Sequence, residues 1–565
     1  MPDVDTAVTN SALWAAAGDA LGWIAELTDE AGLIRRIGKG RLCRPVSWRR
    51  KIGGMNGATV QLPEGTYSDD TQLRIAVCRS IRGDGSFDTE AFAKIELPVW
   101  LNYSLGAGRG TKAAATNLSK RDVSWYSNFF TGGNGRGYVD AGGNGAAMRI
   151  QPHVWQTGGS AKRSYLGNVI RDAVVTHGHM RGILGAVFHA DCVAYALREG
   201  RVPSPESWEE FIEDGFRSVK SALESDPQLS RFWLSSWEAE SQKPFGHAIE
   251  ATINEAKQLL RRLSVAIESP SFDAYVRVLD ALDMRSEERR GAGLHSALAA
   301  VSAAWLYKYD QIEFALVEVV NVIGSDTDTI ATMVGAILGA TSNHAPEWPI
   351  QDHAYIVAQA QRLARIAKGA SEESFPYPDL FSWQAPTTQS DGVGKIEDGL
   401  AIAGLGKIEV FGERWISGNF SWQWARLPFG QTVLCKMKSE MAGVVPAYNL
   451  PPLEQGKSRS ASKSQDAGVL HQEKLPLNVS EHFKKEELDL RSLPNAALSH
   501  NGRLQKGRTL DMITDEVIRN NFDERVIGVC FLECLNSEEG IERAMAFSAI
   551  LAKAHLARNR RNSRR

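Results

Sequence analysis

The 565-residue sequence has few cysteines, little excess charge and no long uninterrupted apolar run near its start. Its six cysteines are scattered without the regular framework of a disulfide-bonded scaffold, which argues against a small secreted protein. The formal net charge of −3 gives no overall attraction to nucleic acid or membranes. The first residues, Met1-Pro2-Asp3-Val4-Asp5, are acidic where a signal peptide would be basic, and Asp19 and Glu26 interrupt the first apolar stretch. These absences favour a cytoplasmic protein with no membrane span there.

Two acidic segments far apart in the chain carry most of the chemical information. They are Ser68-Asp69-Asp70-Thr71 and Asp326-Thr327-Asp328-Thr329, and each precedes a stretch with helical character. Carboxylates are favoured at a helix N-terminus because the first N–H groups lack partners and the helix dipole is positive there. One interpretation is therefore two capped helices with a spare acid each. The other is four carboxylates that converge on divalent cations.

The residue types around the acids narrow the choice of metal. Carboxylate and hydroxyl oxygens suit Mg²⁺, Mn²⁺ or Ca²⁺, and no Cys or His lies beside either segment to suggest zinc. The glycine of a calcium loop is absent after Asp328, and four carboxylates fit a two-ion site. Residues 330–340 are almost all small and apolar, so this helix should be buried. Burying carboxylates is costly unless a cation compensates them, which favours the metal interpretation.

Three further segments complete a pattern. Gly18-Asp19-Ala20-Leu21-Gly22 is followed by Glu26, Gly143 to Arg149 reads Gly-Asn-Gly-Ala-Ala-Met-Arg, and Thr176-His177 is expected to open a long helix. In this order, with the two acidic segments, the chain resembles the ADP-ribosylglycohydrolase family over roughly residues 8 to 370. The resemblance implies an all-α catalytic domain that binds two Mg²⁺ or Mn²⁺ ions between the acidic segments.

The resemblance also implies roles for individual residues. The expected metal ligands are Ser68, Asp69, Asp70, Asp326, Asp328 and Thr329, although the family more often has Thr at the place of Ser68. The expected catalytic acid or base is Asp70 or Glu26. The expected substrate-binding residues are Gly106, Gly108, Gly143, Asn144, Gly145, Met148 and His177. Of the glycine-rich stretches Gly106–Gly110, Gly132–Gly137 and Gly142–Gly145, we expect one to contact phosphate through exposed N–H groups.

The implied reaction is hydrolysis of the glycosidic bond at ribose C1″, which removes ADP-ribose from a modified acceptor. Such bonds break through an oxocarbenium-like transition state, and metal ions can orient the ribose hydroxyls and acidify a bound water. Two alternatives stay open: a hydrolase of a free ADP-ribose derivative, and a non-catalytic relative that binds ADP-ribose or is structural. Retention of all four acids counts against the second. The acceptor itself depends on rim loops that the motifs do not specify.

Five segments are predicted along the chain. Residues 1–370 form the catalytic domain, 371–395 a linker, 396–445 a small β-rich segment, 446–485 a low-complexity linker, and 486–565 a helical segment with a basic tail. The fold class is therefore mainly α with a C-terminal extension containing a small β segment and a helical segment. Phe420, Trp422 and Trp424 alternate with period two, which favours a small hydrophobic core over a stacking platform. The C-terminal region is a candidate surface for a protein or nucleic-acid partner.

Overall fold

The computed structural model describes residues 2–132, 137–268, 273–440, 443–452, 508–537 and 540–562. The chain divides into two units, Met1–Glu454 and Gln455–Arg565, each with its own hydrophobic core. The first unit contains both acidic segments, the helical domain and a β-sheet. The predicted fold class, mainly α with a small β segment and a C-terminal helical segment, is confirmed.

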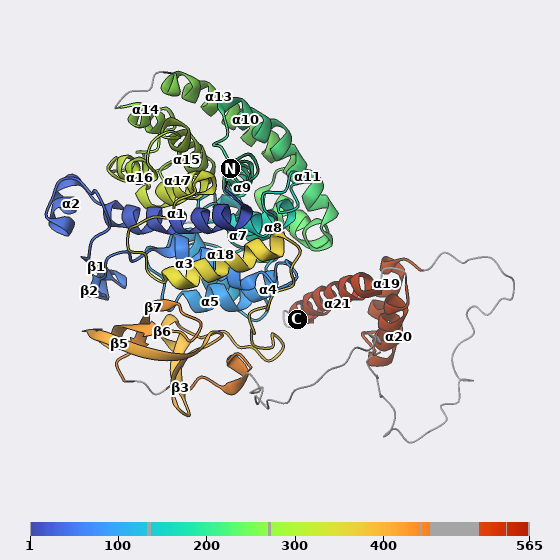
Figure 1. Cartoon of the computed structure of the whole chain (residues 1–565). Helices are drawn as coiled ribbons and strands as arrows, with labels where there is room; N and C mark the ends of the chain where they lie inside the picture. The colour runs from blue at the N-terminus through green and yellow to red at the C-terminus, as the bar shows by residue number, and fades with distance from the viewer. Residues whose placement is uncertain are drawn as a thin grey trace, which may run out of the picture. The chain divides into compact units, whose positions relative to one another are not determined.

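Two buried helices, α1 (Val4–Ala25) and α17 (Thr327–Thr341), pack closely side by side in the larger unit (Figure 1). Glycines allow this approach. A methyl group on Gly22 would lie 2.5 Å from Cα of Asp328, and one on Gly335 would lie 2.6 Å from the carbonyl carbon of Trp14. The hydroxyl of Thr327 donates to the carbonyl oxygen of Gly22 at 2.8 Å. The start of α17, which carries the second acidic segment, is thus held against the last turns of α1.

The remaining helices of the larger unit surround this pair. Among them, α9 is long and apolar enough to cross a membrane, yet its residues are buried among other helices of the domain. The helices that surround α1 and α17 in the larger unit are α2 (Glu30–Ile37), α3 (Asp69–Ser80), α4 (Thr89–Ala91), α5 (Leu97–Trp100), α6 (Arg109–Leu118), α7 (Gln151–Trp155), α8 (Leu166–Thr176), α9 (Met180–Glu199), α10 (Pro205–Glu210), α11 (Phe216–Ser225), α12 (Leu234–Ser241), α13 (Phe245–Ile267), α14 (Ala274–Ala281), α15 (Gly293–Leu306), α16 (Ile312–Val320) and α18 (His353–Ala367).

Two antiparallel sheets belong to the same unit. A hairpin pairs β1 (Trp48–Ile52) with β2 (Ala58–Leu62), with Trp48 opposite Leu62. A five-stranded meander has its strands in chain order: β3 (Val393–Ile396), β4 (Gly399–Ile402), β5 (Gly406–Ser417), β6 (Phe420–Arg426) and β7 (Thr432–Lys438). Trp422 and Trp424 on β6 are buried, in agreement with the predicted hydrophobic core.

Polar contacts join the meander to the helical domain. The amide nitrogen of Asn102 donates to the carbonyl oxygens of Gln389 and Lys436, both at 2.7 Å. In the segment predicted as a linker, the hydroxyl of Tyr377 donates to Glu96 at 2.5 Å, and β3 begins at Val393, inside the predicted bounds of 371–395. The sheet and its approach are therefore packed parts of the helical unit, because buried side chains on both sides find their hydrogen-bond partners across the contact.

The smaller unit contains α19 (Leu510–Arg519), α20 (Glu524–Leu535) and α21 (Gly540–Asn562). Ile513, Val517, Cys530, Cys534 and Phe547 form part of its core. Most of the predicted low-complexity linker, 453–485 of 446–485, lies outside the described residues. So do the side chains of the basic tail, whose arginines are Arg558, Arg560, Arg561, Arg564 and Arg565.

Candidate active site

The first acidic segment begins α3. Ser68 is the N-cap residue, and its hydroxyl oxygen accepts a bond from the backbone N–H of Asp70 at 3.4 Å. The backbone N–H of Asp69 donates instead to the carbonyl oxygen of Leu105 at 2.7 Å, which ties α3 to the Gly106 loop. Ser68, Asp69 and Asp70 are all buried, and Oδ1 of Asp70 has no hydrogen-bond partner within the described structure. A buried carboxylate oxygen without a partner is costly unless something else binds it.

Asp19 on α1 is a site residue that the sequence prediction did not assign. Its Oδ1 accepts from the N–H of Ser68 and its Oδ2 from the N–H of Thr71, both at 2.9 Å. These are N–H groups at the start of α3 that have no partner within the helix. Asp19 therefore fixes the position of the first acidic segment from 49 to 52 residues away. In the sequence, the position of Asp19 within the Gly18–Gly22 motif was the feature that could have indicated a role in the site.

The second acidic segment begins α17, with Asp326 at the N-cap position and Asp328 in the first turn. Asn144, predicted to bind substrate, donates from its amide nitrogen to Oδ2 of Asp326 at 2.9 Å and to the hydroxyl of Ser296 at 3.1 Å. Asp328 is buried, and its Oδ1 accepts the N–H of Thr329 at 2.9 Å. The Gly143–Arg149 segment and the second acidic segment are thus in direct contact.

The two acidic segments lie close enough to influence one another's ionisation. Burial raises the pKa of Asp70 well above its ordinary value, and the charges of Asp19, Asp69 and Asp326 raise it further. Burial likewise raises the pKa of Asp328 well above its ordinary value, with added effects from Glu26, Asp326 and Asp70. Like charges disfavour ionisation of their neighbours in this way. The structure therefore brings together the acids that the sequence places 256 positions apart.

The acids are gathered but do not form a closed metal cage. Within the described ranges, no three Asp, Glu, His or Cys side chains are arranged as a group that could already hold a metal ion. Two arginines offset part of the charge. Arg50 donates to Oε2 of Glu26 at 3.1 and 3.2 Å, and Arg74 lowers the pKa of both Asp19 and Asp70, which burial has raised.

Glu26 lies where α1 ends, as the C-cap residue in extended conformation. Burial raises the pKa of its carboxyl above the ordinary value, the Arg50 charge opposes this, and the Asp326 charge adds to it. The charge of Glu26 in turn raises the pKa of both Asp69 and Asp328, after burial. Glu26, one of the two predicted acid–base residues, therefore lies at the edge of the acidic cluster, directly after the last residue of α1.

Two of the three glycine-rich stretches lie beside the cluster. Gly106 has φ of +83°, and a methyl group on it would lie 2.8 Å from Oδ1 of Asp69. A methyl group on Gly145 would lie 2.7 Å from the hydroxyl of Thr111 and 3.1 Å from Cε1 of His177. Gly108 is exposed, with no heavy atom within 4 Å of the methyl position. Most of Gly132–Gly137 lies outside the described residues.

His177 is placed differently from its predicted position at the start of a helix. Thr176 ends α8, His177 is the C-cap residue, and α9 begins only at Met180, with His179 as its N-cap. The helix ends here because His177 takes an extended backbone, φ −128° and ψ 121°, at the C-cap position. The ring of His177 nevertheless faces the Gly143–Gly145 stretch, where its Nε2 would lie 3.6 and 3.3 Å from methyl groups on those two glycines.

The protonation state of His177 follows from its surroundings. Burial and the neighbouring Arg149 charge lower its pKa to about 3, so the ring is neutral near neutral pH. Thr176 accepts a bond from Arg149 and lies 2.7 Å from Nδ1 of His177. Because that hydroxyl oxygen already accepts from Arg149, its own proton can point at Nδ1, which leaves the ring proton on Nε2. His177 then presents a neutral N–H donor toward the glycine stretch.

Two buried arginines, Arg149 and Arg74, stabilise the backbone of the Gly143–Arg149 segment through hydrogen bonds. Arg149 donates to Asp172 Oδ1 and to the carbonyl oxygen of Gly145, both at 2.8 Å. Arg74 donates to the carbonyl oxygen of Met148 at 2.9 Å, so the predicted substrate residue Met148 contributes its backbone to this network and its side chain to the core. Buried ionised groups of this kind persist only when they are paired and hydrogen-bonded.

The fold and site define an all-α protein with a buried cluster of carboxylates from three helices. A family model described as ADP-ribosylglycohydrolase matches residues 3–373, and the chain belongs to this family of glycosidic-bond hydrolases, as the sequence motifs predicted. The ADP-ribosyl-[dinitrogen reductase] glycohydrolase of Rhodospirillum rubrum is 28% identical over 178 residues, which are 32% of this chain and 53% of that protein. The chain thus matches about half the length of this curated relative. A solved structure titled "ADP-ribosylglycohydrolase-related protein complex" has 19% identity and a TM-score of 0.40, and covers 65% of this chain and all of its own.

Proposed function

We propose that this chain hydrolyses the glycosidic bond at ribose C1″ and releases ADP-ribose from a modified acceptor, with two divalent cations bound between its acidic segments. The observation that carries the proposal is the buried carboxylate cluster of Asp19, Asp69, Asp70, Asp328 and Glu26, in which each pKa is raised. Membership of the family and the similarity to the Rhodospirillum rubrum glycohydrolase support the same reaction for this chain.

The donor set fits two hard cations. Ser68, Asp69 and Asp70 would supply ligands from α3, and Asp326, Asp328 and Thr329 from α17. The buried Oδ1 of Asp70 lacks a hydrogen-bond partner among the described residues, as expected of an oxygen reserved for a ligand. When bound, Mg²⁺ or Mn²⁺ would supply electrostatic stabilisation at the ribose hydroxyls and at a water molecule.

The residues around the cluster have separable tasks in this proposal. Glu26 is the acid–base residue, because it lies at the edge of the cluster with a raised pKa and its carboxylate accepts hydrogen bonds from Arg50. Asp70 is a metal ligand, since its side chain is fully enclosed. His177 donates from Nε2 to the sugar side of the substrate. An acid with a raised pKa can both accept and return a proton near neutral pH.

Of the glycine-rich stretches, Gly106–Gly110 is proposed to bind the diphosphate. Gly108 is the N-cap residue of α6 and provides no side-chain cap, so N–H groups of the first turn remain available to an anion. Lys112 follows one turn later on the same helix, where its charge lowers the raised pKa of Asp69. The Gly106–Gly110 stretch therefore combines free N–H groups with a nearby cation, which suits phosphate oxygens.

The test is the release of ADP-ribose from arginine-linked peptide, serine-linked peptide and a free ADP-ribose derivative, each with Mn²⁺ and with chelator. Metal-dependent release from a peptide supports the proposal, and release only from the free derivative supports the alternative hydrolase. No release with any of these substrates in the presence of Mg²⁺ or Mn²⁺ contradicts an enzymatic function and leaves the non-catalytic interpretation.

Two substitutions separate the proposed roles. Glu26→Gln should abolish release while Mn²⁺ binding persists, because the variant removes the titrating group and keeps the shape. Asp70→Asn should weaken Mn²⁺ binding and release together. Glu64→Ala is the matched control, since Glu64 is exposed in the loop before α3 and should leave both measurements unchanged. Equal loss of Mn²⁺ binding in both site variants would contradict the separate role of Glu26.

We further propose a cytoplasmic location. All six cysteines are free, including the exposed Cys43, and unpaired thiols are typical of a reducing compartment.

A further inference from the structure

A strongly basic segment follows the end of α1. Residues 35–51 contain six arginines and two lysines and no acidic residue, in a chain whose net charge is −3. The segment covers the end of α2, the loop after it and strand β1. In the described structure, Arg36, Lys39, Arg44, Arg49 and Lys51 have no carboxylate within ion-pair distance. A local excess of unpaired cations on a nearly neutral protein marks a surface for an anionic ligand.

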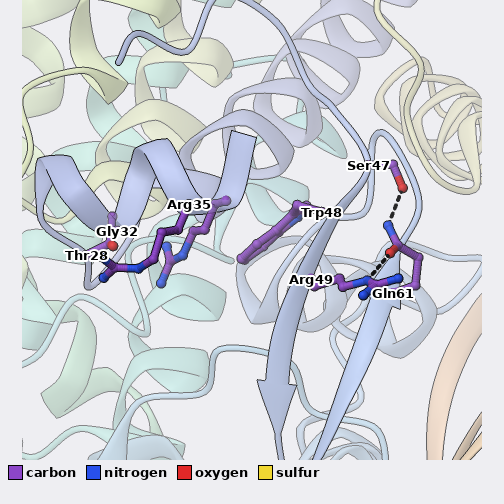
Figure 2. A pocket seen from close by; sticks show the side chains of 8 residues that line it. Thr28, Gly32, Arg35, Ser47, Trp48, Arg49 and Gln61 are labelled. Carbon is purple, nitrogen blue, oxygen red and sulfur yellow. Dashed lines mark hydrogen bonds between the residues drawn. The ribbon is translucent and has the colours of Figure 1, made fainter. Parts of the chain in front are cut away.

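The segment borders a cavity of about 470 Å³ (Figure 2). Arg35 from α2 lies on one side and Arg49 from β1 on the other (Figure 2), Arg36 also lines the cavity, and no acidic side chain is among the lining residues. Gln61 on β2 accepts a bond from Nε of Arg49 at 3.0 Å, which orients that guanidinium and leaves its other N–H groups free. Trp48 forms the wall between them.

One residue that lines the cavity, Arg36, contacts the backbone at the edge of the acidic cluster. Nη1 of Arg36 donates to the carbonyl oxygens of Ile24 and Glu26, at 2.7 and 2.8 Å, and its guanidinium lies 5.2 Å from the ring centre of Trp48. On the same strand Arg50 points the other way and binds the carboxylate of Glu26. One hairpin thus presents Arg49 to the cavity and Arg50 to the proposed acid–base residue, because neighbouring side chains on a strand alternate in direction.

The charge of Arg36 is poorly compensated. Burial, and then the neighbouring charges of Arg50 and Arg35, lower its pKa to about 10, with only Glu26 opposing. An anion in the cavity would relieve the repulsion between these guanidinium groups. Guanidinium forks match the paired oxygens of phosphate, and arginine outnumbers lysine six to two in this segment.

We propose that the cavity and the basic segment 35–51 bind the phosphodiester backbone of a nucleic acid, and that an ADP-ribosylated nucleic acid is an acceptor for the neighbouring site. The second clause rests on the proposed function; the first does not. The cations are spread along a helix end, a loop and a strand, which suits a chain of phosphates better than a single anion. Trp48 is buried and does not offer a face for base stacking, so recognition is through the backbone and independent of base sequence.

The test is fluorescence anisotropy with labelled single-stranded DNA, duplex DNA and RNA of about 20 nucleotides, measured on the full chain from about 50 to about 200 mM salt. Arg35→Glu/Arg49→Glu is the cavity variant, since both side chains are exposed and neither contacts the acidic cluster. Arg261→Glu/Arg262→Glu on the exposed face of α13 is the matched control. The basic tail is unchanged in both variants, so its contribution cancels in the comparison.

We expect the wild-type chain to bind at low salt and to lose affinity as salt rises. The cavity variant should bind about tenfold more weakly than the wild type, and its affinity should depend less steeply on salt. The control variant should bind like the wild type. Absence of binding, or equal weakening in both variants, overturns the proposal. Equal affinity for poly-glutamate overturns it in favour of an acidic protein partner. ADP-ribose release from whichever peptide the wild type cleaves, measured on the same variants, should be unchanged; no release from any of the three substrates named above would contradict the proposed function and leave the binding result standing.

Discussion

Asp19 accepts the backbone N–H of Ser68 at 2.9 Å and so positions the first acidic segment from a different helix. Its other oxygen accepts the N–H of Thr71 at the same distance. Both bonds need an acceptor, and a carboxylate provides two. Asp19 therefore acts through Ser68 and its neighbours and is a positioning residue.

Asp19→Asn should keep the fold and weaken the site. The amide group can accept only one of the two bonds, and its NH₂ group would face an N–H group, which costs about 1–3 kcal/mol. Mutation of a group that orients metal ligands typically lowers metal affinity or activity by about 10–100-fold. Mn²⁺ titration followed by ADP-ribose release measures both effects, with exposed Asp310→Asn as the control. Unchanged Mn²⁺ affinity would mean that Asp19 does not position the acids.

Gly22→Ala should separate the start of α17 from α1. The added methyl group would lie 2.5 Å from Cα of Asp328, so the helices must move apart. Overpacking of this kind costs about 1–3 kcal/mol, and Mn²⁺ affinity should fall with it because Asp328 moves. Gly167→Ala on α8 meets no atom within 4 Å and should stabilise the protein by about 0.4–1 kcal/mol. Denaturant unfolding of both variants is the measurement; equal stability would contradict the close packing.

Asp172→Asn should expose the pH dependence of the buried network. Burial alone would raise the pKa of Asp172, but the Arg149 charge and the His153 hydrogen bond outweigh it and lower the pKa below its ordinary value. A lowered folded-state pKa contributes stability above the unfolded-state pKa, and this contribution is lost as pH falls through the folded-state pKa.

The variant should therefore be less stable by about 3–5 kcal/mol near neutral pH, because Arg149 is left buried without its partner. This deficit should stay constant down to about pH 5 and shrink at lower pH, where Asp172 of the wild type becomes protonated first in the unfolded state and then in the folded state. Urea unfolding of both proteins across this pH range is the measurement. A deficit that grows as pH falls would contradict a lowered pKa of Asp172 in the folded state.

Tyr67→Phe should loosen the contact between the acidic segment and the sheet. The hydroxyl of Tyr67, the residue before Ser68, donates to Oδ2 of Asp352 at 2.6 Å, and the same carboxylate accepts the N–H of Thr432 at 2.9 Å. Loss of a hydrogen bond to a charged group costs about 1.5–3 kcal/mol. Exposed Tyr448→Phe is the control. Thermal unfolding should show the loss in the variant alone; equal midpoints would mean that the contact does not stabilise the unit.

Local chemistry explains what could be predicted from the sequence. Ser68 and Asp326 were identifiable because helix starts have a short-range signature of hydroxyls and carboxylates before a periodic stretch, and α3 and α17 do begin there. The alternation of Trp422 and Trp424 similarly predicted a buried strand face. In both cases the relevant partners lie within a few residues, so the pattern is visible without the fold.

Long-range contacts explain what could not be predicted. The bonds of Asp19 and the docking of β7 on Asn102 join residues with no shared local pattern. The break between α8 and α9 at His177 was not predicted because Thr and His allow a helix to continue, whereas in the fold His177 is extended and the N–H of Gly178 donates to the distant carbonyl oxygen of Tyr138. The basic segment 35–51 was visible in the sequence but was averaged out in the net charge.

We propose that both acidic segments together hold the cations needed for ADP-ribose release. The most direct measurement adds Mn²⁺ back to chelator-treated protein and follows bound Mn²⁺ and ADP-ribose release in the same samples. We predict that release appears only as two Mn²⁺ ions bind, and that Asp328→Ala loses both binding and release while its fold persists. Full release without metal, or an Asp328→Ala variant that binds Mn²⁺ and turns over like the wild type, would contradict it.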